Sequence, residues 1–155
     1  MQKVSHNYRV VVISLSSPLL VGIYLDDILI KTITSSQKTS EALVPILKDV
    51  LDNFDVKEII YANGPGSYMA IKLTYIILET IHIIKDITIR ASSAFEFNSN
   101  KPIKAMGNLY FIKEKETIIT KKFTEPITME YTLLKSLKDL SIEESNRPDY
   151  RLPAV

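Results

Sequence analysis

The residues whose types and spacing best suit chemistry form one short turn, Gly64-Pro65-Gly66-Ser67, directly after an apolar run. A glycine turn between a strand and a helix can hold a phosphate, because backbone amides approach the ligand and the helix start carries positive partial charge. Here no third glycine completes a dinucleotide fingerprint, and no lysine follows as in a Walker motif. Pro65 also removes one amide. The pattern therefore favours a structural turn that ends a strand and caps a helix at Ser67.

Other candidates for catalysis are few. The chain has no cysteine, and its two histidines, His6 and His82, are too far apart in sequence to form a metal-ligand motif by spacing. Ser14 and Ser16 occupy the first predicted strand, where a metal-dependent nuclease or phosphotransferase needs carboxylates. Acidic residues gather instead in a turn and around a helix end, where turn chemistry and a solvated face account for them. We expect no catalytic residue, no cofactor site and no metal site in this chain.

The bulk composition limits the class of protein. A chain of 155 residues that is 46% hydrophobic can bury a sizeable core, as one domain or two very small ones. A formal net charge of +1, from 19 basic and 18 acidic residues, gives no overall field to gather nucleic acid or an anionic membrane. The first apolar run is short and soon interrupted by serines, which indicates a strand and not a signal peptide. A cytoplasmic, soluble protein is expected.

The first two-thirds of the chain predict a mixed α/β sheet with helices packed on its faces, because short β-rich runs are followed by alternating helical and strand patterns. The expected elements are, in order, three antiparallel strands within 8–34, a helix over 40–54 capped by Ser40, a strand over 56–62, a helix over 67–84, a strand over 86–90 and a short helix within 92–97.

The pattern changes after residue 102. The run NLYFIKEKETIITKKF predicts a hairpin that turns near 114–116. The segment 129–140, MEYTLLKSLKDL, has apolar residues at helical spacing and predicts an amphipathic helix. The tail from 143 onward has two prolines and little periodicity, so we expect an extended arm.

The predicted helix over 67–84 is unusually apolar. On a helical wheel, Lys72, Glu79 and His82 form one narrow stripe, joined by Tyr68 and Tyr75. The remaining arc, roughly two-thirds of the circumference, is apolar, whereas a helix on one sheet face usually needs a stripe of only ~100°. Either the helix over 40–54 hides the excess within the monomer, or both helices form a platform for another protein. We favour the platform.

Several segments resemble the TsaB family, also called YeaZ, which acts in the synthesis of threonylcarbamoyladenosine in tRNA. The run GPGSYMAIKLTYIILETI is similar to the family's Gly-Pro-Gly-Ser helix start, and TSEALVPILKDVL to its upstream His-Ser-Glu-x-Leu-x-Pro helix. Downstream, ASSAF and GNLYF resemble two further family segments, and RPDYRLP its closing segment. The main resemblance covers about residues 8 to 111.

The resemblance implies an RNase H-like fold of the actin-like ATPase superfamily without catalytic activity of its own. It implies an N-terminal subdomain over 1–100 that carries the partner-binding helices, and a truncated C-terminal subdomain over 101–155. The implied partner is TsaD, the threonylcarbamoyl transferase, which dimerises with this chain, and TsaE, an ATPase, joins them. The complex modifies the adenosine next to the anticodon of tRNAs that read ANN codons, so tRNA contact by this chain is indirect. ATP and threonylcarbamoyl-AMP are used by the partner subunits.

The implied interface lies on the two helices. Its expected residues are Leu43, Leu47, Tyr68, Ile71, Lys72, Tyr75 and Leu78. The chain departs from the family pattern at Met69 and Ala70, where Thr-Gly is usual, and at Lys72, where Arg is usual. Ser14 and Leu15 stand where Asp-Thr is common. These changes weaken any inherited nucleotide or metal contact and leave helix packing intact.

Two other classes stay open at this point. A small actin-like phosphotransferase or an RNase H-like nuclease would require the isolated chain to bind Mg²⁺ or ATP. A stand-alone homodimer would use the same two helices for self-association, because an interface for a structural relative also suits a second copy.

Overall fold

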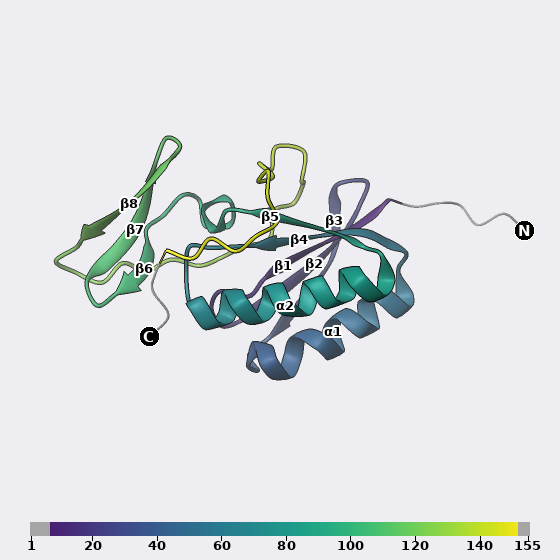
Figure 1. Ribbon diagram of the computed structural model, residues 1–155. Helices are drawn as coiled ribbons and strands as arrows, with labels where there is room; N and C mark the ends of the chain where they lie inside the picture. Colours follow the sequence, from purple (N-terminus) through teal and green to yellow (C-terminus); the bar gives the residue numbers. More distant parts are fainter. Residues whose placement is uncertain (1–6, 152–155) are drawn as a thin grey trace, which may run out of the picture.

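The computed structural model of the chain describes residues 7–151 (Figure 1). His6 and the last two residues of the RPDYRLP segment lie outside this range. The elements are β1 (Tyr8–Ile13), β2 (Leu19–Leu25), β3 (Ile28–Ser35), α1 (Thr39–Asn53), β4 (Val56–Ala62), α2 (Tyr68–Lys85), β5 (Thr88–Ser92), the 3-10 helix η1 (Ala94–Phe97), β6 (Ile103–Met106), β7 (Leu109–Glu114) and β8 (Thr117–Lys122).

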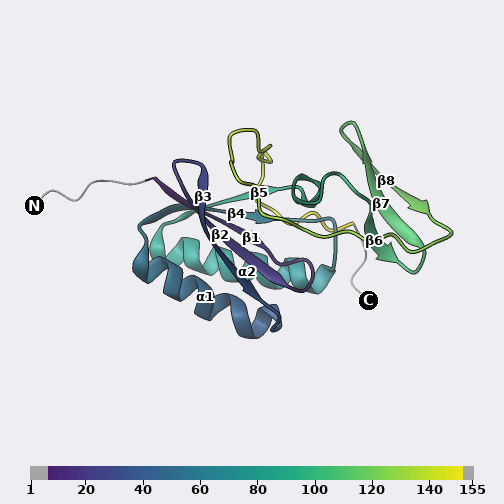
Figure 2. The same cartoon turned by 180° about the vertical axis from the view of Figure 1, so that it is seen from behind.

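The larger sheet has five strands in the order β3-β2-β1-β4-β5. Strands β1, β2 and β3 form an antiparallel meander, and β1, β4 and β5 are parallel. Both crossovers, through α1 and through α2, advance in the same direction across the sheet, and right-handed crossovers then place both helices on one face. Figures 1 and 2 show α1 and α2 together on that face. The predicted mixed sheet flanked by helices is confirmed.

Both faces of the five-stranded sheet are buried at its central strand β1. In β1, Val10 and Val12 pack in the core beneath the helices, while Val11 and Ile13 pack in a second core on the opposite face. Successive side chains of a strand point to opposite faces, so a strand covered on both sides is apolar without interruption. This arrangement explains the continuous apolar run in β1.

The second face of the sheet is covered by the segment 129–140, which has no helix. The helix predicted there from the sequence is therefore a wrong prediction. The segment's apolar residues do reach the second core, and they include Tyr131, Leu134, Leu137 and Leu140. Its backbone, however, bonds to the sheet: Leu29 donates to Lys135 O (3.0 Å), and Leu137 donates to Asp27 O (2.9 Å). Because a helix would use those groups internally, the bonds to the sheet compete with helix formation and prevail.

The second sheet has three antiparallel strands in the order β6-β7-β8. Strand β7 ends at Glu114 and β8 begins at Thr117, so the hairpin predicted to turn near 114–116 is confirmed. Strand β6 was not expected from the sequence. Phe111 of β7 and Ile103 of β6 pack with η1, which ties this sheet to the rest of the chain.

The two helices begin differently. Ser67 caps α2, where its Oγ accepts a hydrogen bond from Ala70 N (3.5 Å), as predicted. The predicted Ser40 cap of α1 is wrong, because Lys38 occupies the cap position without a side-chain bond and α1 begins at Thr39. Within residues 7–151, no helix combines the length and the apolar composition needed to cross a membrane.

Candidate protein-protein interface

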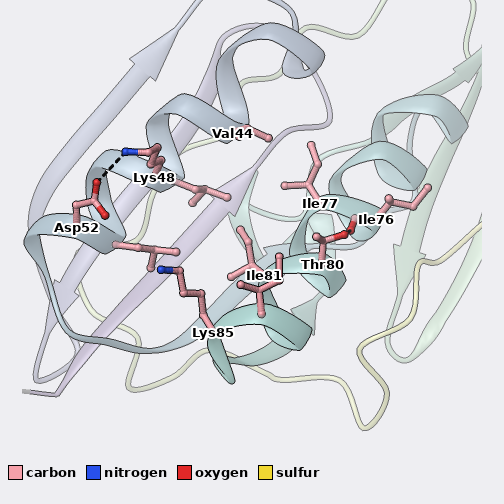
Figure 3. A pocket seen from close by; sticks show the side chains of 11 residues that line it. Val44, Lys48, Asp52, Ile76, Ile77, Thr80, Ile81 and Lys85 are labelled. Atoms are coloured by element: carbon pink, nitrogen blue, oxygen red, sulfur yellow. Dashed lines mark hydrogen bonds and ion pairs between the residues drawn. The ribbon is translucent and has the colours of Figure 1, made fainter.

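An open, mostly apolar groove of about 400 Å³ runs between α1 and α2 (Figure 3). Side chains of both helices point into it. The lining residues are Val44, Leu47, Lys48, Leu51, Asp52, Ile76, Ile77, Thr80, Ile81, Ile84 and Lys85. The only charged side chains among them are Lys48 and Asp52, which form an ion pair (3.2 Å), and Lys85.

The rim of the groove exposes large aliphatic side chains to solvent. Val44 is 52% exposed, Ile76 51% and Ile84 71%. Ile77 and Ile81 of α2, which also line the groove, are partly buried against the core. Helix α1 therefore hides part of the apolar excess of α2 and leaves the rest exposed. A contiguous apolar surface of this kind is typical of a site where another protein binds.

Four of the seven residues expected at the interface lie in the core. Leu43, Leu47, Ile71 and Leu78 are at most 1% exposed. Leu47 also lines the floor of the groove. Leu43, Leu47 and Leu78 pack in the core beneath the helices, and all four side chains present almost no surface to a partner. The structure therefore places these four residues inside the protein, and their contact with a partner stays a prediction. The rim positions named above, in contrast, are exposed.

The other three expected residues, Tyr68, Lys72 and Tyr75, lie outside the groove. The Tyr68 ring packs against Tyr150 of the C-terminal segment, with centroids 4.8 Å apart, and Lys72 Nζ lies 5.7 Å from the Tyr68 ring. Tyr75 is partly buried, and its ring centroid is 6.3 Å from that of Tyr61. Of these three side chains, Tyr68 contacts the chain's own C-terminal segment and Tyr75 contacts β4.

The rim residues Val44, Ile76 and Ile84 were not among the residues expected from the sequence. The signal was present, since Ile76 and Ile84 belong to the apolar arc of the wheel. What the sequence does not reveal is the direction of the sheet, which decides which part of that arc is buried. In the structure, the buried residues Ile71 and Leu78 mark the side of α2 that is turned into the protein.

The glycine turn has a structural role. Gly64 has φ +122°, and a Cβ there would lie 2.7 Å from the backbone oxygen of Asp149 and 3.0 Å from Ile71 Cδ1. Its carbonyl accepts a hydrogen bond from Ala94 N (2.8 Å). The turn thus carries a glycine at position 64 because the C-terminal segment passes directly over it.

A second, more polar pocket of about 680 Å³ lies beside the ends of β1 and the starts of both helices. Its polar lining consists of hydroxyl side chains, such as Ser14, Ser16 and Thr39, together with Gln37 and Lys38. Ser14 and Thr39 hydrogen-bond to each other (2.7 Å). No carboxylate lines this pocket in the described part of the chain, whereas Mg²⁺ prefers carboxylate oxygens.

Known proteins resemble this chain in fold but not detectably in sequence. No family model matches the sequence, and no curated protein matches it. Among solved structures, YeaZ from Pseudomonas aeruginosa aligns with 96% of this chain and 72% of its own, at a TM-score of 0.58 and 10% identity. The fold is YeaZ-like. A second match, an uncharacterized protein with similarity to peptidase YEAZ from Pseudomonas aeruginosa, has a TM-score of 0.57 and 11% identity.

The YeaZ-like fold is the RNase H-like, actin-like fold expected from the sequence. The second match covers 76% of this chain but only 64% of the other protein, so the chain spans less than two-thirds of that protein's length. The match to YeaZ from Pseudomonas aeruginosa covers 96% of this chain, and therefore most of the region that holds the five-stranded sheet, α1 and α2. In this chain, the groove is therefore a feature of the helical layer of a YeaZ-like fold.

Proposed function

We propose that the chain is a TsaB-like scaffold subunit that binds a TsaD-type threonylcarbamoyl transferase through the groove between α1 and α2. The chain supplies no catalytic group. ATP and threonylcarbamoyl-AMP are used by the partner subunits, with a TsaE-type ATPase joining the complex, and the product is threonylcarbamoyladenosine in tRNA. The observation that carries the proposal is the exposed aliphatic rim of Val44, Ile76 and Ile84 on the helical layer of a YeaZ-like fold.

The rim is energetically suited to a protein partner. Fully burying one Val or Ile side chain stabilises a complex by about 1.5–3 kcal/mol. The three rim residues are about half to three-quarters exposed, so their burial contributes several kcal/mol toward association. Association itself costs roughly 4–15 kcal/mol in lost freedom of motion. The rim can anchor an interface, but further contacts around it are needed to offset the whole cost of association.

Co-expression with the TsaD of the same organism tests the proposal. The two chains should co-elute as a near-1:1 complex on size exclusion, and Ile76→Glu should separate them. Ile30→Glu is the matched control, because Ile30 is the same residue type at similar exposure, 47% against 51%, but lies on the edge strand β3. Independent elution of the wild-type chains would reject the proposal. Light scattering without TsaD would then show whether the groove serves a homodimer.

A further inference from the structure

The C-terminal residues 141–151 run along the free edge of β5 and on toward the start of α2 (Figure 1, yellow). Glu143 N donates to Ala91 O (2.8 Å), and Ser92 Oγ donates to Ser141 O (2.7 Å). The first bond satisfies a backbone carbonyl at an edge of β5 that would otherwise be open to another strand, and the second joins a β5 side chain to the segment. We call this segment, residues 141–151, the strap.

Asn146 is the residue through which the strap joins three elements. Its Nδ2 donates to Glu79 Oε1 of α2 (3.1 Å) and lies 3.3 Å from Ile89 O of β5. Its backbone oxygen accepts a hydrogen bond from the Tyr61 hydroxyl of β4 (2.6 Å). Burial, with smaller effects from nearby tyrosines and Glu79, raises the pKa of Tyr61 far above its ordinary value, so the hydroxyl keeps its proton. One side chain and one carbonyl thus link α2 to the sheet.

The strap also contacts the chain at and just before the start of α2. Asn63 Nδ2 donates to Arg147 O (2.9 Å), and Asp149 N donates to Asn63 O (2.9 Å). Beyond these bonds, Tyr150 packs on Tyr68, the first residue of α2. The contacts at Tyr68 and Glu79 are about 16 Å apart along the helix at 1.5 Å per residue. Two separated contacts restrict the rotation and tilt of a helix, which one contact cannot do.

We propose that the strap fixes the rotation and tilt of α2, with Asn146 as its positioning residue, and thereby fixes the shape of the groove on the other side of that helix. The groove depends on this because α2 supplies Ile76, Ile81 and Ile84 to its lining. This role of the strap lies within the chain itself and does not depend on the proposed partner. The competing explanation is that the strap only covers the edge of β5.

Hydrogen exchange on the full chain separates the two explanations. In Asn146→Asp, a carboxylate replaces the amide donor beside Glu79, so like charges repel the strap from α2. We expect amides of the strap and of α2 to exchange about tenfold faster, and those of β1 less than twofold faster. Adding Glu79→Gln to this variant removes the repulsion and supplies an amide donor, so exchange in α2 should return to within about threefold of wild type.

A milder variant covers the case in which Asn146→Asp does not fold. Tyr61→Phe removes only the hydroxyl that donates to Asn146 O, and it should raise exchange in the strap and in α2 about threefold. Faster exchange in the strap with none in α2 would overturn the inference, as would an equal rise in every element. Exchange requires no partner, so this result stands or fails separately from the TsaD proposal.

Discussion

Replacing Gly64 by alanine tests the close approach between the glycine turn and the strap. The new Cβ would lie 2.7 Å from Asp149 O, which is backbone and cannot rotate away, and 3.0 Å from Ile71 Cδ1. A non-glycine residue at positive φ costs roughly 1–2 kcal/mol, and overpacking a dense site costs roughly 1–3 kcal/mol. The two effects together predict a loss of about 2–5 kcal/mol in the free energy of unfolding.

Thermal unfolding measures this loss. A change of 1 kcal/mol shifts the Tm of a chain of this size by about 2–4 °C, so Gly64→Ala should lower Tm by roughly 4–20 °C. Gly107→Ala is the matched control, because Gly107 also has positive φ (+55°) but no atom within 4 Å of the position its Cβ would take. Gly107→Ala therefore reports the backbone cost alone, about 1–2 kcal/mol. Equal losses in both variants would refute the argument that the strap explains Gly64.

Two further perturbations test the packing of the sheet. Burial raises the pKa of Tyr24 to about 12, and because the unfolded hydroxyl ionises near pH ~10, its contribution to stability is complete below that pH and is lost as pH rises toward 12. Urea unfolding between pH 8 and 11 should show this loss as a free energy of unfolding that falls with pH. Tyr24→Phe should make that fall less steep, and an unchanged pH dependence in this variant would refute the role given to Tyr24. Glu58, which binds Arg9 (2.6 Å) and Arg90, is mostly buried, so Glu58→Gln should cost about 1.5–3 kcal/mol. The exposed Asp52→Asn change at the Lys48 pair should cost about 1 kcal/mol or less at pH 7, and equal costs would contradict this reasoning.

The sequence predicted the elements whose signals are local. The meander, the β4 to β5 unit and both helices follow from apolar periodicity and turn residues, and Ser67 marks the start of α2 through a bond within its first turn. The RNase H-like fold followed from segments of the same region. These signals depend on neighbours in sequence, so the sequence alone is enough to read them.

The failures involve partners that are distant in sequence. The segment 129–140 has helical spacing, yet Lys135 O accepts a hydrogen bond from Leu29, more than a hundred residues earlier. Likewise, the apolar arc of α2 was evident from the sequence, but which part of it is buried depends on where the sheet lies. The expected interface therefore included the core residue Leu78 and omitted the exposed Ile84. Tertiary contacts that the sequence does not reveal decided both cases.

The affinity of this chain for the TsaD of its own organism tests the central claim most directly. Isothermal titration should show binding by the wild-type chain, and Ile84→Glu should weaken it at least about thirtyfold, the equivalent of about 2 kcal/mol. Ile83→Glu is the control on the same helix, because Ile83 is even more exposed, 79% against 71%, but does not line the groove. Its Kd should stay within about threefold of wild type. No binding by the wild-type chain, or equal weakening by both variants, would contradict a partner site in this groove.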